Sequence, residues 1–106
     1  MFGMEEMMRQ VQSLQTKIKR LQKDLEERVY EGTSGGGVVK AFVNGKKMLL
    51  KIEISKEAVE GDDVGMLEDM VVAAVEEAQR KADEAAQEEM RRITGSLPIP
   101  PGLLPF

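Results

Sequence analysis

The fold is decided by residues 38–54, which have the sequence VVKAFVNGKKMLLKIEI. Apolar residues recur at alternate positions on both sides of Asn44-Gly45, a pair that favours a two-residue type I′ turn. We therefore predict a β-hairpin with strands at 38–43 and at about 46–54. Pairing the strands about this turn predicts a core face made of Val39, Ala41, Met48, Leu50, Ile52 and Ile54.

The other face of the hairpin is mixed. It carries Val38, Phe42 and Leu49 among charged residues, and these apolar side chains indicate that a second subunit covers part of it. A further short strand is predicted before the hairpin, at 28–33. The glycines at 35–37 are predicted to connect the strands rather than to hold a phosphate, because a strand and not a helix follows them.

Two helices flank the strands. Between Met4 and Leu25 the apolar residues lie alternately three and four positions apart, which is typical of a coiled-coil seam. A narrow stripe on a rod of roughly 36 Å needs another helix to cover it. The residues predicted to form this dimer or core contact are Met7, Val11, Leu14, Ile18, Leu21 and Leu25.

The second half of the chain predicts a helical turn at 55–60, an acidic cap at 61–63 and a long helix with an alanine-rich stripe that ends at Gly95. We expect an α+β fold with one domain at 1–95: an N-terminal coiled-coil-like helix, a three-stranded antiparallel sheet and a long C-terminal helix. Residues 96–106 form an apolar, proline-rich tail that is predicted to dock on another surface.

The composition excludes most catalytic chemistry. The 106 residues include no His and no Cys, which removes the usual zinc ligands, thiolates and the commonest general base. We expect no enzyme activity, no metal, no cofactor and no small-molecule substrate. A single domain of this length buries a modest core, which favours association. The absence of a signal-like start and of an apolar run of roughly 20 residues predicts a cytoplasmic protein without a membrane partner.

Charge is distributed unevenly along the chain. Residues 1–51 contain ten Lys/Arg and six Asp/Glu, a net charge of +4, whereas residues 52–106 contain five and thirteen, a net charge of −8. A surface that binds an acidic partner is therefore expected in the first half.

The first predicted helix carries cations without an intervening acid between Met7 and Lys23. These side chains would contact DNA phosphates, or they would form the ordinary solvated face of a coiled coil, and the residues alone leave both interpretations open. The candidate DNA contacts on this helix are Arg9, Lys17, Lys19, Arg20 and Lys23.

A second group of lysines surrounds the hairpin. They would contact the DNA backbone, or they would protect a sheet edge against aggregation. Neither group lies on a recognised base-reading element, so binding is expected to be directed mainly at phosphates. The secondary candidates are Lys40, Lys46, Lys47 and Lys51.

Motifs at both ends and in the middle of the chain resemble the YbaB/EbfC family. They are the Met-Phe-Gly start, the Gly-rich break before Val38-Val39-Lys40, the Asn44-Gly45 turn, Lys-Ile-Glu-Ile at 51–54, Met-Leu-Glu-Asp-Met-Val at 66–71 and the Leu/Pro-rich end. The sequence departs from the family pattern at Ile54-Ser55-Lys56, where relatives more often have Asp-Pro. The resemblance implies an intertwined homodimer with a shared β-sheet core and protruding helices, which binds double-stranded DNA in the nucleoid.

Two other functions fit the same pattern. A prefoldin-like chaperone or coiled-coil adaptor also has the order helix, hairpin, helix, and there the two helices pair along their length. A purely structural dimer is the third alternative. With the resemblance, binding of double-stranded DNA by a homodimer is the function that we expect.

Overall fold

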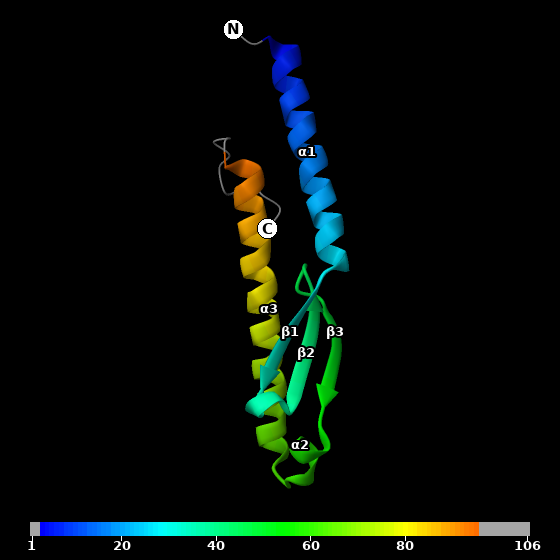
Figure 1. The fold of residues 1–106 in the computed structure, drawn as a ribbon, viewed down its shortest axis with the longest axis vertical. Coiled ribbons are helices and arrows are strands. Elements are labelled where there is room, and N and C mark those ends of the chain that lie inside the picture. Colours follow the sequence, from blue (N-terminus) through cyan, green and yellow to red (C-terminus); the bar gives the residue numbers. More distant parts are fainter. Residues whose placement is uncertain (1–2, 96–106) are drawn as a thin grey trace.

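The computed structural model describes residues 3–95 and has an α+β fold (Figure 1). Helix α1 (Met4–Glu27) is followed by strands β1 (Val29–Ser34), β2 (Val39–Asn44) and β3 (Leu49–Ile54), with a 3-10 turn, η1 (Gly35–Gly37), between β1 and β2. A short helix, α2 (Lys56–Glu60), precedes the long helix α3 (Val64–Thr94). The chain is elongated, at 70 × 21 × 16 Å. The predicted tail at 96–106 lies outside the described residues.

The three strands form an antiparallel sheet in the order β1-β2-β3. Helix α3 lies across one face of this sheet, over β1 and β2 (Figure 1). The prediction of three strands between two helices is confirmed, and so is the alanine-rich stripe of the second helix. Fully buried residues from the sheet and from α3 form the main core: Val39, Ala41, Val43, Ala74, Ala78 and Ala82.

Small residues bring α3 unusually close to β1. A Cβ atom at Gly32 would overlap the carbonyl oxygen of Ala74 and the backbone nitrogen of Ala78. Two residues further along β1, the hydroxyl of Ser34 donates a hydrogen bond to the carbonyl oxygen of Met70, at 2.5 Å. The backbones of strand and helix are therefore in direct contact, and they can approach this closely because Gly32 has no side chain.

The Asn44-Gly45 turn differs from the predicted type I′ turn. The carbonyl of Asn44 accepts from the N–H of Lys47 at 2.9 Å, and Lys47 takes the left-handed conformation with φ 68°. The Asn44 side chain also accepts from the N–H groups of Lys46 and Met48, at 2.9 and 3.0 Å. The loop is consequently longer than two residues, and β3 begins at Leu49 instead of Lys46.

Glycine is required at position 45 because the backbone of another residue lies close to it, and not because it takes a positive φ. Its N–H donates to the carbonyl of Leu25 at 2.6 Å, and a Cβ atom here would lie 2.8 Å from the Cα atom of Leu25. The Asn-Gly pair therefore predicts the hairpin correctly but the type of turn wrongly. Contact with the end of α1 selects a loop conformation that differs from the one favoured by the local sequence.

The predicted core face is only partly covered. Val39 and Ala41 of β2 are buried, but on β3 the exposed fractions are 51% for Leu50 and 43% for Ile54, and Met48, in the loop before it, is 63% exposed. Helix α3 covers β1 and β2, so it leaves the same face of β3 open. The register pairs Ile54 with Val39 and Ile52 with Ala41, as alternation predicts, but a β-bulge pairs Leu49, not Leu50, with Val43. The expected face is therefore wrong at the start of β3, and the expectation that this chain buries all of these residues is wrong.

The apolar seam of α1 divides into two parts. Leu21 and Leu25 are buried in a second cluster with Ala86 and Met90 of α3, and Ile18 packs at its margin. Helices α1 and α3 are antiparallel here, and the N-terminal half of α1 extends beyond the end of α3 (Figure 1). The described part of the chain thus provides a covering helix for the C-terminal half of the seam.

A carboxylate on α3 joins the helix to β1. Glu77 pairs with Lys81 at 3.2 Å, and Lys81 donates to the carbonyl of Glu31 at 2.9 Å. The pKa of Glu77 is lowered, chiefly by the hydrogen bond from Lys81 and also by one from the backbone of Thr33, against an opposing effect of burial.

Replacing Gly32 with Ala is expected to lower the free energy of unfolding by at least about 2 kcal/mol, because the added methyl group meets backbone atoms that cannot move independently. Chemical denaturation at fixed protein concentration measures this loss. Gly61→Ala is the matched control, since no atom lies within 4 Å of a Cβ there. Equal denaturation midpoints for the two variants would contradict the close contact.

Replacing Glu77 with Gln is expected to destabilise the protein at pH 7 but not in acid. Because the folded pKa lies below the ordinary value of a glutamate, ionised Glu77 contributes stability that is fully present above that ordinary pKa and is lost as the pH falls through the folded pKa. Denaturation curves from pH 7 down to about pH 3 should show the two proteins converging. Glu76→Gln, on an exposed neighbour, is the control, and a difference that persists in acid would exclude the ionic cause.

Candidate functional site

The candidate cations of α1 form one continuous polar face. The helix extends over 24 residues without Pro or Gly, so its face is unbroken. At about 100° per residue four of these side chains point away from the apolar seam and Lys17 flanks it, and the first and last are roughly 21 Å apart along the axis. All of them are exposed: Arg9, Lys17, Lys19, Arg20 and Lys23.

These cations are not neutralised within the described chain. Between residues 3 and 95, no carboxylate lies within ion-pair distance of any of the five. The acids of α1 stand at its two ends, with Glu5 and Glu6 in the first turn and Asp24, Glu26 and Glu27 after the basic face. The helix therefore presents a positive surface in its middle.

The hairpin lysines are in a different electrostatic situation, because each has a carboxylate partner. The ion pairs are Lys40 with Glu31 at 3.8 Å, Lys46 with Glu26 at 3.0 Å, Lys47 with Asp83 at 3.2 Å and Lys51 with Glu53 at 2.9 Å. The hydrogen bond from Lys51 is the main cause of the lowered pKa of Glu53. Exposed pairs of this kind add little stability, but they cancel most of the field that an approaching anion meets.

Contacts at the base of α1 fix its direction. Besides the bond between Gly45 and Leu25, the Arg28 guanidinium donates to the carboxylate of Glu89 at 3.4 Å. The pKa of Arg28 is raised, first by its hydrogen bond with Tyr30 and then by Glu89. Sequence reasoning missed these positioning residues, because Arg28 and Glu89 are 61 positions apart and neither belongs to a motif.

The seam residues lie in three environments. Met7 and Val11 are 60% and 55% exposed, whereas Leu14 and Ile18 are half-buried. Leu21 and Leu25 are buried against α3 of the same chain. The N-terminal half of the seam thus remains without a partner in residues 3–95.

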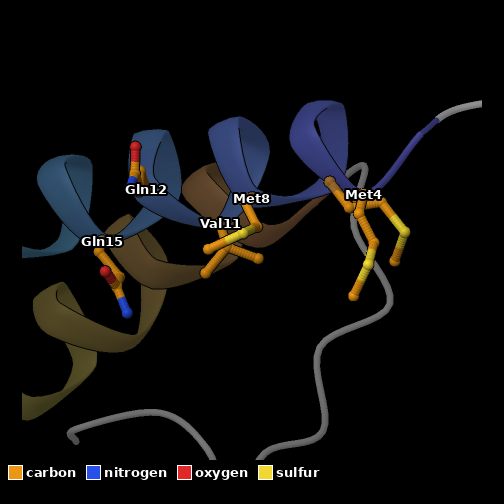
Figure 2. Close-up of a pocket in the computed structure, with 6 residues that line it drawn as sticks. Met4, Met8, Val11, Gln12 and Gln15 are labelled. Atoms are coloured by element: carbon orange, nitrogen blue, oxygen red, sulfur yellow. The ribbon is translucent and has the colours of Figure 1, made fainter.

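The N-terminal half of α1 carries an open apolar groove of about 420 Å³ (Figure 2). It has no acid, base or nucleophile suited to catalysis, because methionines, one valine and glutamines line it. Its residues are Met4, Met7, Met8, Val11, Gln12 and Gln15. Within residues 3–95, no three His, Cys, Asp or Glu side chains gather in a way that would hold a metal ion. None of the helices in this range is long and apolar enough to span a membrane.

Comparison with known families identifies the fold and its relatives. Residues 1–97 match the model of the YbaB/EbfC DNA-binding family. The chain belongs to this family. The sequence resemblance is therefore confirmed, on a match that spans both helices and the sheet between them.

Relatives within the YbaB/EbfC family are similar over nearly their whole length. A nucleoid-associated protein of Caldanaerobacter subterraneus subsp. tengcongensis is 48% identical over 99 residues, which cover 93% of this chain and 89% of the relative. A nucleoid-associated protein of Pelotomaculum thermopropionicum is also 48% identical, over 92% of this chain and 93% of the relative. One from Dictyoglomus thermophilum is 42% identical, over 92% and 94%. Family and relatives point to a nucleoid-associated DNA-binding protein and not to an enzyme.

A crystal structure confirms the architecture independently of sequence. An uncharacterized protein from Helicobacter pylori superposes with a TM-score of 0.79, covering 90% of this chain and all of the other, at 16% identity. At that identity the likeness concerns the fold alone. The helix, three strands and helix are thus an arrangement that strongly diverged sequences adopt.

Proposed function

We propose that this YbaB/EbfC-family chain acts in the nucleoid as a homodimer that binds double-stranded DNA mainly through its phosphates. The observation that supports this most directly is the basic face of α1, whose cations have no carboxylate partner within residues 3–95. Cations without carboxylate partners release condensed counterions from DNA, which is the main source of sequence-independent affinity. The five α1 cations are the principal contacts in this proposal.

The hairpin lysines take a secondary role. Each would have to exchange an existing carboxylate for a phosphate, so its net gain on binding DNA is smaller than that of an unpaired cation. Helix α1 also has no aromatic side chain on which a base would stack, which favours contacts with the backbone of an intact duplex.

Strand β3 supports the homodimer. It is an edge strand that exposes large apolar residues: Leu49 is 47% exposed, Leu50 51% and Ile54 43%. An edge of this kind promotes association, and a second copy of the chain covers it without leaving an open edge. Two α1 arms in one dimer would double the phosphate contacts and raise the affinity through avidity.

The chaperone and adaptor alternative requires two helices that pair along their length. Within residues 3–95, the apolar contact between α1 and α3 is made by Ile18, Leu21 and Leu25 of α1. The N-terminal half of α1 extends beyond the end of α3 (Figure 1). DNA binding remains the function that the arrangement supports best.

Reversing two charges on the basic face, with Lys19→Glu and Arg20→Glu together, is expected to weaken binding to an arbitrary duplex by at least about tenfold at about 100 mM salt. The slope of log affinity against log salt should fall by about 2 for each protomer that contacts the DNA. Fluorescence anisotropy of a labelled duplex, titrated at several salt concentrations, measures both quantities.

The matched control for charge is the pair Lys56→Glu and Arg80→Glu. Both residues are exposed and have no ion pair within the described residues, and the change in net charge is the same. If both double variants lose affinity equally, overall charge and not the α1 face determines binding. An unchanged affinity for the α1 variant would remove these two residues from the interface.

Replacing Leu50 with Asp is expected to raise the dimer dissociation constant by at least about tenfold, because the carboxylate would be buried in an apolar interface. Sedimentation should show a wild-type mass of twice 11.8 kDa and a shift towards one chain for the variant. Val72→Asp is the control, since Val72 is 54% exposed on α3. A wild-type protein that sediments as one chain at micromolar concentration would contradict the homodimer itself.

A further inference from the structure

The N-terminal half of α1 exposes an apolar surface that neither the fold nor the proposed DNA contacts use. Met4 is 82% exposed, Met7 60%, Met8 61% and Val11 55%. Figure 2 shows Met4, Met8 and Val11 pointing to the same side of the helix, together with Gln15. At about 100° per residue this surface lies away from the basic face, so DNA bound there would not cover it.

We propose that the C-terminal segment of the same chain, residues 96–106, binds in this groove and caps the apolar half of α1. The segment SLPIPPGLLPF has no charged side chain and is rich in Leu, Ile, Phe and Pro. The groove and the segment are therefore matched in polarity, and their contact removes apolar area of both from water.

The direction and reach of the chain fit this assignment. Helix α3 runs antiparallel to α1 (Figure 1). Ile93, near the end of α3, packs beside the cluster of Leu21 and Leu25. From the level of Ile18 to Met4 the distance along α1 is roughly 21 Å. Residues 96–106 in a polyproline conformation reach about 34 Å. The end of α3 thus points towards the groove, and the segment that follows has enough length to line it.

The groove also suits a proline-rich backbone. Prolines lack an N–H group, and a polyproline helix makes no internal hydrogen bonds, so its carbonyls need donors. Gln12 and Gln15 border the groove and supply amide N–H donors, while flexible Met side chains adapt to an irregular ligand.

A second copy of α1 is a less suitable occupant. A coiled-coil partner needs a narrow stripe, whereas Met8 widens the apolar surface to about 100° around the helix. The C-terminal segment is also covalently attached, and a short tether gives it an effective concentration near the millimolar range. The attached C-terminal segment therefore outcompetes a free partner that has a similar affinity for the groove.

The full-length protein allows a direct test, because the natural chain has no Cys and its methionines are built-in reporters. A nitroxide attached to Gly102→Cys should broaden the methyl signals of Met4, Met7 and Met8 in NMR spectra. The signals of Met48 and Met66, which are 63% and 59% exposed elsewhere, should be unaffected. A nitroxide on Lys56→Cys is the control for random collisions and should leave the three groove methionines sharp.

A mixing experiment shows whether the segment in the groove comes from the same chain or from another copy. Chains that carry the nitroxide but no isotope are mixed with isotope-labelled chains that carry no nitroxide. Sharp signals from Met4, Met7 and Met8 in the mixture, with broadening in the uniform sample, support binding within one chain. Broadening in the mixture assigns the groove to another copy and overturns the proposal, as does the absence of broadening in both samples.

A second measurement avoids any label in the segment. Truncation after Gly95 should speed the peroxide oxidation of Met4, Met7 and Met8 by at least about threefold, because uncovered thioethers react faster. Mass spectrometry measures each site, and Met66 is the internal control. Unchanged rates in a truncated protein that still folds would also overturn the proposal. Neither measurement involves DNA, so its result is independent of the DNA-binding proposal.

Discussion

The contact between β1 and α3 is the constraint on which the other features depend. Gly32 has no side chain, and the residues opposite it on α3 are Ala74 and Ala78, so the two backbones lie against each other. This close packing holds α3 over β1 and β2 and leaves the matching face of β3 open. The same helix continues past the sheet to Ala86 and Met90, where it holds the base of α1. One tight contact thus positions both the apolar edge and the basic arm.

Electrostatics divides the surface in a way that net charge conceals. The chain is acidic overall, at −4, yet its carboxylates are placed beside the hairpin lysines and along α3. The middle of α1 lacks such partners, so its positive field is retained while that of the hairpin is largely cancelled. An acidic protein can in this way keep one surface that attracts a polyanion and repel it elsewhere.

Much of the fold is predictable from sequence, since periodicity reveals the type of each element and the face it buries. The three strands, the alanine stripe of α3 and the Asp63 cap, which accepts from the N–H of Met66 at 2.9 Å, were all indicated by local pattern. Periodicity does not say what covers a face, however. It therefore could not show that Leu50 stays exposed in one chain, or that Leu25 packs on α3. The candidate cations are identifiable from sequence, but their separation into paired and unpaired groups depends on carboxylates distant in the chain, such as Asp83 beside Lys47.

Within residues 3–95, α1 contacts the sheet and α3 only near its C-terminal end, so its length is nearly independent of the packing of the sheet. An insertion of seven residues in the free half would extend the arm by roughly 10.5 Å and rotate its tip by only about 20°, so that the cations keep their orientation. Insertions of two or five residues would turn the tip by about half a revolution relative to the base. The arm is therefore an element whose reach evolution or design can adjust in steps of one heptad without changing the sheet that supports it.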